Sequence, residues 1–181
     1  MKRWGFALLA GALVLPGGAR AVSVGAGIFA GPSIPVIQDD TGTGVQFGLR
    51  LPIHVIPALT IEPFYARSNL GDVTETFNGT EYTRSGFDDD SFGVTLAMGG
   101  LGLSPGAPFY PYGSIASHNM TRAGSEDISE VGYELGLGFS FRLSPLAFNV
   151  RAGGGLVATG DTSRKFFNVN LGVATKLYGK P

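Results

Sequence analysis

Residues 131–142 read V-G-Y-E-L-G-L-G-F-S-F-R, and this stretch decides how the rest of the chain is interpreted. Its odd-numbered residues are all large and apolar, whereas its even-numbered residues are glycine, serine or a charged residue. An alternation with a period of two residues predicts a β-strand with two chemically different faces. The second face is mostly glycine, where a soluble sheet would present charged residues to water. We therefore interpret the stretch as one strand of a membrane barrel, with its small residues facing a narrow interior.

The composition also disfavours a water-soluble domain. Of the 181 residues, 44% are hydrophobic and only 15% are charged, which is little charge for a soluble surface. No run of about 18 apolar residues occurs, so the sequence predicts no membrane-spanning helix. The chain contains no cysteine, which excludes a fold held together by disulfides.

The first 21 residues have the pattern of a secretory signal peptide. Lys2 and Arg3 form a basic start, an apolar run follows, and Ala19-Arg20-Ala21 fits a cleavage motif. We expect cleavage after this motif and an outer-membrane barrel domain over residues 22–181; an uncleaved helical anchor is the alternative, which the shortness of the apolar run disfavours. Without residues 1–21, ten of the 13 basic residues remain against 14 acidic ones, a balance that implies no nucleic-acid partner.

Seven further segments alternate in a similar way. The eight expected strands span residues 22–31, 43–53, 59–67, 91–100, 109–121, 131–142, 146–158 and 165–178. We expect irregular pairing at Pro63 and read residues 68–90, which lack sustained periodicity, as one long loop. Long acidic connections alternate with short turns that contain Pro57, Pro105 or Pro145. The pattern predicts an all-β fold, an eight-stranded antiparallel up-and-down transmembrane β-barrel.

In this alternation of strands, long loops and short turns, residues 22–178 resemble the small eight-stranded outer-membrane proteins of the OmpA/OmpX type. The resemblance implies a barrel in the outer membrane of a Gram-negative bacterium, with both termini in the periplasm and no open pore. It also implies a monomer surrounded by outer-membrane lipid and lipopolysaccharide and inserted by the barrel assembly machinery. Such proteins usually end on an aromatic residue, whereas three residues follow Tyr178 here.

The polar face of the strands predicts an ion network inside the barrel. A charge in so narrow a space must be paired, so we expect Glu62 and Glu134 to pair with Arg50 and Arg151. Glycines on the same face would make room for these groups. The alternatives are an unconnected set of solvated charges, or a proton or ion pathway through them. The other polar residues on this face are Gln46, Asn149, Asn168 and Asn170.

Aromatic residues near the strand ends are expected to form two girdles at the membrane interfaces, although scattered barrel aromatics are an alternative. The expected girdle at the turn end contains Phe109, Tyr110, Phe139, Phe141, Phe148 and Tyr178. The one at the loop end contains Tyr65, Phe92, Tyr133, Phe166 and Phe167.

Acidic residues gather in the four long connections. They could bind divalent cations or a cationic partner, but Asp88-Asp89-Asp90 lacks the spacing of an EF-hand loop, and a solvated, repulsive surface is the simpler interpretation. These residues are Asp39, Asp40, Asp72, Glu75, Glu81, Asp88, Asp89, Asp90, Glu126, Asp127 and Asp161.

The sequence predicts no catalytic, cofactor or metal site. Ser117-His118-Asn119 is similar to the lipid A-modifying barrel enzymes, which use Ser, His and an acid, but adjacent residues on a strand face opposite sides and cannot form a nucleophile–base pair. We therefore predict a non-enzymatic outer-membrane protein with a structural, adhesive or surface-interaction role and no wide pore. The alternatives are a soluble, exported, lipocalin-like barrel that binds a small apolar ligand inside, or a lipid A-modifying enzyme.

Overall fold

The computed structural model describes residues 23–36, 40–56, 59–99, 108–124, 127–159 and 162–179. Their strands are β1 (Ser23–Pro35), β2 (Gly42–Arg50), β3 (Ile53–Ile56), β4 (Leu59–Gly71), β5 (Val73–Phe77), β6 (Thr80–Arg84), β7 (Asp88–Ala97), β8 (Phe109–Thr121), β9 (Ile128–Leu143), β10 (Leu146–Thr159) and β11 (Thr162–Tyr178). Over these ranges, no helix has the length and apolar character needed to cross a membrane. The expected signal peptide lies outside the described residues.

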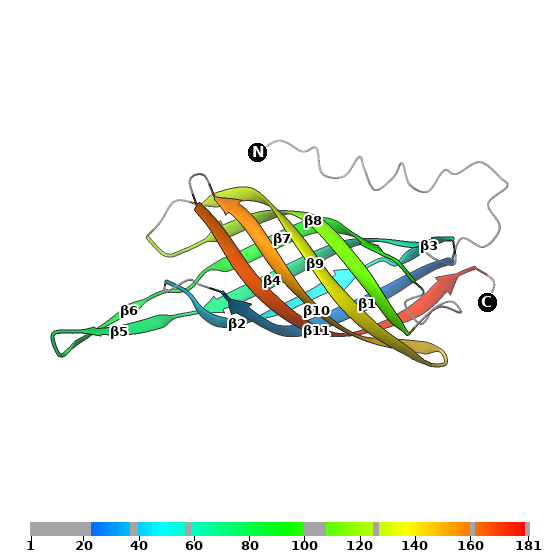
Figure 1. Ribbon diagram of the computed structural model, residues 1–181, viewed down its shortest axis with the longest axis horizontal. Coiled ribbons are helices and arrows are strands. Elements are labelled where there is room, and N and C mark those ends of the chain that lie inside the picture. The colour runs from blue at the N-terminus through cyan, green and yellow to red at the C-terminus, as the bar shows by residue number, and fades with distance from the viewer. Residues whose placement is uncertain are drawn as a thin grey trace.

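The sheet closes on itself to form a barrel (Figure 1). Neighbouring strands pair antiparallel in chain order, and β1 closes the wall by pairing with β11 from Val24↔Tyr178 to Pro35↔Phe166. Because β3 continues the path of β2 between β1 and β4, the wall has eight strand positions, as the sequence predicted. A closed wall leaves no sheet edge with unsatisfied backbone groups.

The wall is irregular where β2 gives way to β3. Pairing with β4 is interrupted between Arg50 and Ile53. Pro52 and Pro63 both lie at this break, and neither has the N–H that a regular ladder requires. The irregular pairing expected at Pro63 is therefore found here, but the single strand predicted over residues 43–53 is divided in two.

Residues 68–90 are mostly β-structure, and the prediction of one long loop was wrong. β4 continues to Gly71, β7 begins at Asp88, and the hairpin β5–β6 between them projects beyond the barrel (Figure 1). Asn78 and Gly79 form its turn with φ angles of 51° and 79°, and two positive φ angles are what a type I′ hairpin turn requires. Hydrophobic periodicity missed these strands because both faces of the hairpin carry polar residues.

The two faces of the barrel wall have the chemistry that the opening stretch predicted. On β9, Tyr133 and Leu135 point outward, with Leu135 74% exposed, whereas Gly132 and Gly138 are buried. The outer face elsewhere is also apolar, as shown by the exposed side chains of Ile28, Val45, Phe47, Leu49, Phe92, Leu96, Ile115, Val150, Leu156 and Leu171. The polar and small residues of the strands therefore fill the interior, and the apolar ones cover the outside.

Two of the expected girdle aromatics lie inside the barrel. Tyr110 is 1% exposed and Phe166 is 8% exposed. Each is adjacent in sequence to an outward-facing aromatic, Phe109 or Phe167, and neighbours on a strand face opposite sides. A run of outward aromatics does cross β8, β9 and β10, with ring centroids 4.9, 6.1 and 5.4 Å apart along Phe109, Phe139, Phe141 and Phe148.

Candidate functional site

A buried ion cluster lies in the barrel interior. The guanidinium of Arg151 on β10 donates two hydrogen bonds to the carboxylate of Glu62 on β4, from Nη1 to Oε1 at 2.6 Å and from Nη2 to Oε2 at 3.0 Å. Nη1 of Arg50 lies 4.0 Å from Glu62 Oε1, and its Nη2 donates to Asn149 at 2.7 Å. All four side chains are buried. The two-pronged geometry is the strongest form of an arginine–carboxylate contact.

Two tyrosines enclose Arg151 from β8. Arg151 Nε donates to the hydroxyl of Tyr110 at 3.1 Å. The guanidinium carbon also lies 5.6 Å from the centre of the Tyr110 ring and 5.2 Å from that of Tyr112. The arginine charge is thus satisfied by a carboxylate, a hydroxyl and two aromatic rings.

Glu134 faces the interior, but its partners are not arginines. Its carboxylate accepts hydrogen bonds from the Tyr112 hydroxyl at 2.6 Å and from the Asn168 side-chain amide at 2.7 Å. The register explains the difference, because β10 places Gly155 opposite Glu134 and sets Arg151 four residues away, about 13 Å along the strand. Of the four predicted network residues, the structure brings three together and leaves Glu134 in a neighbouring hydrogen-bonded group.

Glycines make room for these large groups, as the sequence analysis expected. A Cβ atom at Gly138 would overlap the Tyr110 ring, and one at Gly136 or Gly153 would overlap Tyr112. A Cβ atom at Gly172 would overlap the guanidinium of Arg50. The glycine-rich inner face is therefore a steric requirement of the buried network.

The ion cluster borders a cavity of only about 40 Å³, between Gln46, Glu62, Tyr112, Glu134 and Asn170. Such a volume holds a few water molecules. Eight strands enclose an interior just wide enough for side chains, and these side chains fill it. Along the described strands, this level of the barrel is packed rather than open.

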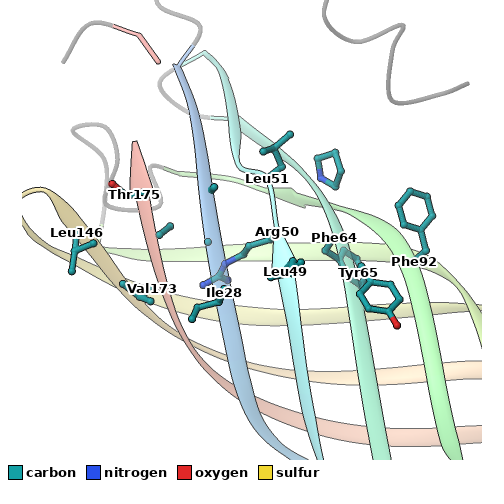
Figure 2. A pocket seen from close by; sticks show the side chains of 14 residues that line it. Ile28, Leu49, Arg50, Leu51, Phe64, Tyr65, Phe92, Leu146, Val173 and Thr175 are labelled. Carbon is teal, nitrogen blue, oxygen red and sulfur yellow. The ribbon is translucent and has the colours of Figure 1, made fainter. Parts of the chain in front are cut away.

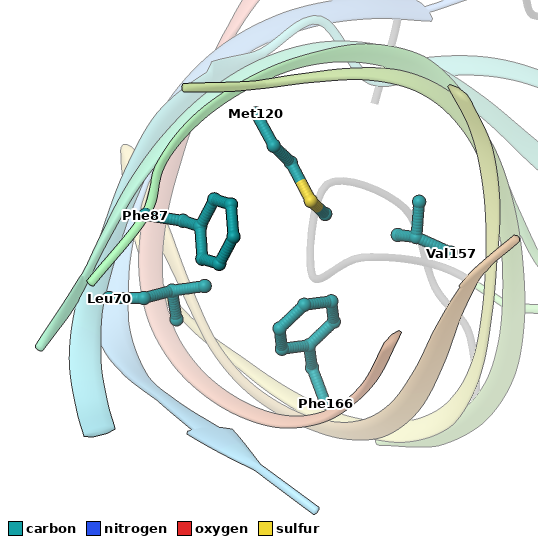
Figure 3. Packing of buried hydrophobic residues seen from close by; sticks show 5 residues of the cluster. All are labelled: Leu70, Phe87, Met120, Val157 and Phe166. Atoms are coloured by element: carbon teal, nitrogen blue, oxygen red, sulfur yellow. The ribbon is translucent and has the colours of Figure 1, made fainter. Parts of the chain in front are cut away.

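Apolar side chains form a plug toward the loop end (Figure 3). They come from five different places around the wall and meet across the interior, and each is at most 8% exposed. The plug consists of Leu70, Phe87, Met120, Val157 and Phe166. The barrel interior is therefore polar in its middle and apolar at the level of the plug, near the end that carries the longer connections.

Asp40, Arg122 and Arg164 gather around Phe87, which is also part of the plug. We call these four residues the clasp. The guanidinium carbons of Arg122 and Arg164 lie 4.0 and 4.1 Å from the centre of the Phe87 ring. Both arginines also bond Asp40, with Arg122 Nη1 at 3.3 Å and Arg164 Nη2 at 2.9 Å from Oδ2. The hydrogen bond from Arg164 is the main reason that the pKa of Asp40 is lowered from 3.8 to about 2.

Each clasp residue comes from, or lies beside, a different long connection. Asp40 precedes β2, Phe87 precedes β7, Arg122 follows β8, and Arg164 lies near the start of β11. Arg122 Nε also donates to the backbone carbonyl of Ser85 at 2.7 Å. The clasp therefore ties all four connections at this end to one another.

The hairpin β5–β6 leaves the barrel through a narrow neck. At the neck, the Leu70 N–H donates to the Phe87 carbonyl at 2.8 Å, and the Gly86 N–H donates to Asp72 Oδ1 at 2.9 Å. Beyond the neck, β5 and β6 pair only with each other, and every residue after Val73 in these strands is exposed. The hairpin is the part of the described chain that extends farthest from the barrel (Figure 1).

The outer wall carries an open apolar depression of about 520 Å³ (Figure 2). Its lining side chains come from strands on both sides of the β1–β11 seam, and they include Ile28, Leu49, Tyr65, Phe92, Leu146 and Val173. It lies on the outward face, so it is no counterpart of the internal pocket that a lipocalin would need. An exposed apolar surface of this extent is typical of a lipid or protein interface.

Solved structures with this fold were found by comparison. The Neisserial surface protein A, NspA, matches with a TM-score of 0.51 over 86% of this chain and 97% of its own, at 13% sequence identity. The chain has the fold of the small eight-stranded outer-membrane barrels. Ail, the attachment invasion locus protein of Yersinia pestis, matches over 88% of this chain and all of its own, with a TM-score of 0.44 and 14% identity. No protein-family model and no curated protein matches the sequence.

His118 lies within hydrogen-bonding distance of an acidic side chain, a contact that the sequence analysis did not predict. Its Nδ1 lies 2.8 Å from Oδ2 of Asp89, and Asp89 is buried rather than in an exposed loop as predicted. Ser117 is exposed on the opposite face, as expected for adjacent strand residues. Ser91, which pairs with His118 across the sheet, donates to the backbone of Ala66 instead. Among the described residues, the histidine–acid pair thus has no serine hydrogen-bonded to it.

The plug and the clasp of the barrel were not predicted from the sequence either. Met120, Val157 and Phe166 lie within predicted strands, but which inward side chains meet across the interior depends on the register of several strands. Leu70 and Phe87 lie within residues 68–90, which were read as a loop, so the period-two pattern was not applied to them. A signal was nevertheless present, because Leu70 and Phe87 are large apolar residues within a polar segment. In the ranges that the structure describes, no group of three or more His, Cys, Asp or Glu side chains could hold a metal ion.

Proposed function

We propose that this protein is an integral outer-membrane barrel whose role is a surface interaction carried by the hairpin β5–β6, with no passage for solutes. The observation that carries the proposal is the inverted pattern of the wall, with large apolar side chains outward and a filled, polar interior. In water, each such side chain left exposed forgoes roughly 1.5–3 kcal/mol of burial. A surrounding of lipid and lipopolysaccharide removes this cost, and the barrel assembly machinery would insert the chain there.

The interior supports a role on the surface rather than in transport. The ion cluster, the plug and the clasp succeed one another along the barrel, and the cavity beside the ion cluster measures about 40 Å³. A binding role inside the barrel would need a pocket of several hundred cubic ångströms. The hairpin, by contrast, places exposed residues well beyond the wall (Figure 1).

Cell fractionation combined with surface proteolysis tests the proposal. Arg84 is the only basic residue within β5 and β6, so trypsin added to intact cells should cut the hairpin there and leave the barrel in the outer-membrane fraction. The variant Arg84→Gln should resist this cut and serves as the matched control. Recovery of the protein in the soluble periplasm would overturn the membrane location. Cleavage at Arg84 only after cell lysis would overturn the surface role.

A further inference from the structure

The hairpin β5–β6 has two faces of different chemistry. Cross-strand pairing places Glu75 opposite Tyr82 and Phe77 opposite Thr80, so these residues share one face, and the pair Val73–Arg84 lies at the neck end of the same face. We call Glu75, Phe77 and Tyr82 the aromatic face. The other face carries Thr74, Thr76, Glu81 and Thr83, with the hydroxyls of Thr74 and Thr83 3.2 Å apart.

The aromatic face is exposed without a structural reason. Phe77 and Tyr82 are 67% and 59% exposed. On the barrel wall such exposure is explained by lipid, but the hairpin projects past the wall and its strands pair only with each other (Figure 1). A polar threonine face alone would suffice for solubility. Two large aromatic residues on one face of an extended ribbon are therefore available to contact another molecule.

The charge around this face selects the kind of molecule. The hairpin and its neck carry three carboxylates, on Asp72, Glu75 and Glu81, against the single guanidinium of Arg84, which lies at the neck end of the aromatic face, away from Phe77. Glu75 lies directly across from Tyr82 and two residues from Phe77 on the same face. A cation over either ring would gain from the ring and from the carboxylate at once. An anionic partner such as a sulfated glycan would be repelled.

We propose that the aromatic face docks an extended, basic peptide segment of an external protein, with Lys or Arg side chains over Phe77 and Tyr82 and paired with Glu75. The inference rests on the proposed surface role and names the class of its partner. A second copy of this chain fits less well, because the hairpin and its neck carry more carboxylates than basic groups and two copies would repel one another. The flat, two-stranded face also matches an extended segment better than a helix.

The test measures binding of a fluorescent peptide of alternating lysine and valine to the full-length barrel in lipid nanodiscs, by anisotropy at physiological salt. Glu75→Gln and Tyr82→Ala should each weaken binding by at least about fivefold. Glu81→Gln removes the same charge from the threonine face and should weaken binding less than about twofold. Heat-dependent gel mobility of each variant verifies that the barrel is folded.

Three results would overturn the inference. Equal weakening by Glu75→Gln and Glu81→Gln would mean that the general negative field, and not the aromatic face, attracts the peptide. Stronger binding of a glutamate–valine peptide or of a sulfated oligosaccharide would mean that the partner is anionic and not basic. No binding of the lysine–valine peptide, with Arg84 still cleaved on intact cells, would reject the partner class and leave the surface role standing.

Discussion

Among the described residues, Glu62 is the one carboxylate that contacts two buried arginines, Arg50 and Arg151. It is 1% exposed and lies within 4.0 Å of both guanidinium groups. Arg151 directs two hydrogen bonds at it, whereas Arg50 shares its charge and completes its own bonding with Asn149. A buried carboxylate in this setting cannot be removed without leaving positive charge unpaired.

Glu62→Gln should therefore lower the free energy of unfolding by about 3–5 kcal/mol, the cost of leaving buried charge without its partner. Urea unfolding of the barrel in lipid vesicles measures this. The matched control is Glu134→Gln, which disturbs hydrogen bonds to the neutral side chains of Tyr112 and Asn168 and should cost only about 1–3 kcal/mol. A larger loss in the control would mean that Glu134, and not Glu62, is the centre of the network.

Asp40 makes the clasp sensitive to strong acid only. Its folded-state pKa of about 2 lies below the ordinary 3.8, so its ionised form stabilises the fold above about pH 4, and this contribution is lost as the pH falls toward 2. The melting temperature of Asp40→Asn should thus lie below that of the unmodified protein by a constant amount above about pH 4. The gap should close near pH 2. Asp127→Asn, at an exposed loop carboxylate, should show no such gap at any pH.

The sequence could predict which charges enter the barrel but not how they pair. The period of two residues places Arg50, Glu62, Glu134 and Arg151 on the inner face, because a strand offers no other direction. Which of them meet depends on strand register, and no single strand contains that information. Glu134 illustrates this, since its strand pairs it with Gly155 and leaves it to Tyr112 and Asn168.

At the level of the elements, apolar alternation identified all eight strand positions of the wall, although it assigned most of β3 to a turn, and it missed β5 and β6 outside the wall. β8 has the bounds that were expected, residues 109–121, and it continues through Pro111, which was expected to interrupt it. β5 and β6 were taken as a loop because polar residues occupy both faces. Their formation depends on the Asn78-Gly79 turn, a local signal that does not involve burial.

Gly79→Val should unfold the hairpin while leaving the barrel intact. Gly79 has a φ of 79°, and a β-branched residue in this left-handed region costs roughly 1–2 kcal/mol, a large amount for a two-stranded ribbon. Hydrogen exchange of the backbone amides in β5 and β6 should accelerate, and global unfolding in urea should not change. Asn78→Gly, which tolerates its φ of 51°, should preserve the slow exchange. Unaltered exchange in Gly79→Val would contradict a turn-dependent hairpin.

For the whole molecule, the position of a residue relative to the membrane should matter more than its exposure. Leu135 and Leu143 on β9 are 74% and 62% exposed, but Leu135 lies mid-strand and Leu143 at the turn end. Leu135→Arg should cost about 2–4 kcal/mol in lipid, and Leu143→Arg roughly 0–1 kcal/mol, because the cost of a charge falls toward the interface. Unfolding in lipid vesicles measures both. Equal, small effects would indicate that water rather than lipid surrounds the wall.

At the loop end, the clasp that seals the barrel is structurally separate from the hairpin that projects beyond it. The neck bonds at Leu70–Phe87 and Asp72–Gly86 close before the hairpin begins, and no clasp residue lies within β5 or β6. The hairpin can therefore be shortened, lengthened or exchanged for a foreign sequence between Asp72 and Gly86 while the seal beneath it stays assembled. Under the proposed surface role, the molecule would act as a display scaffold, in which the hairpin can change in sequence while the barrel that carries it stays intact.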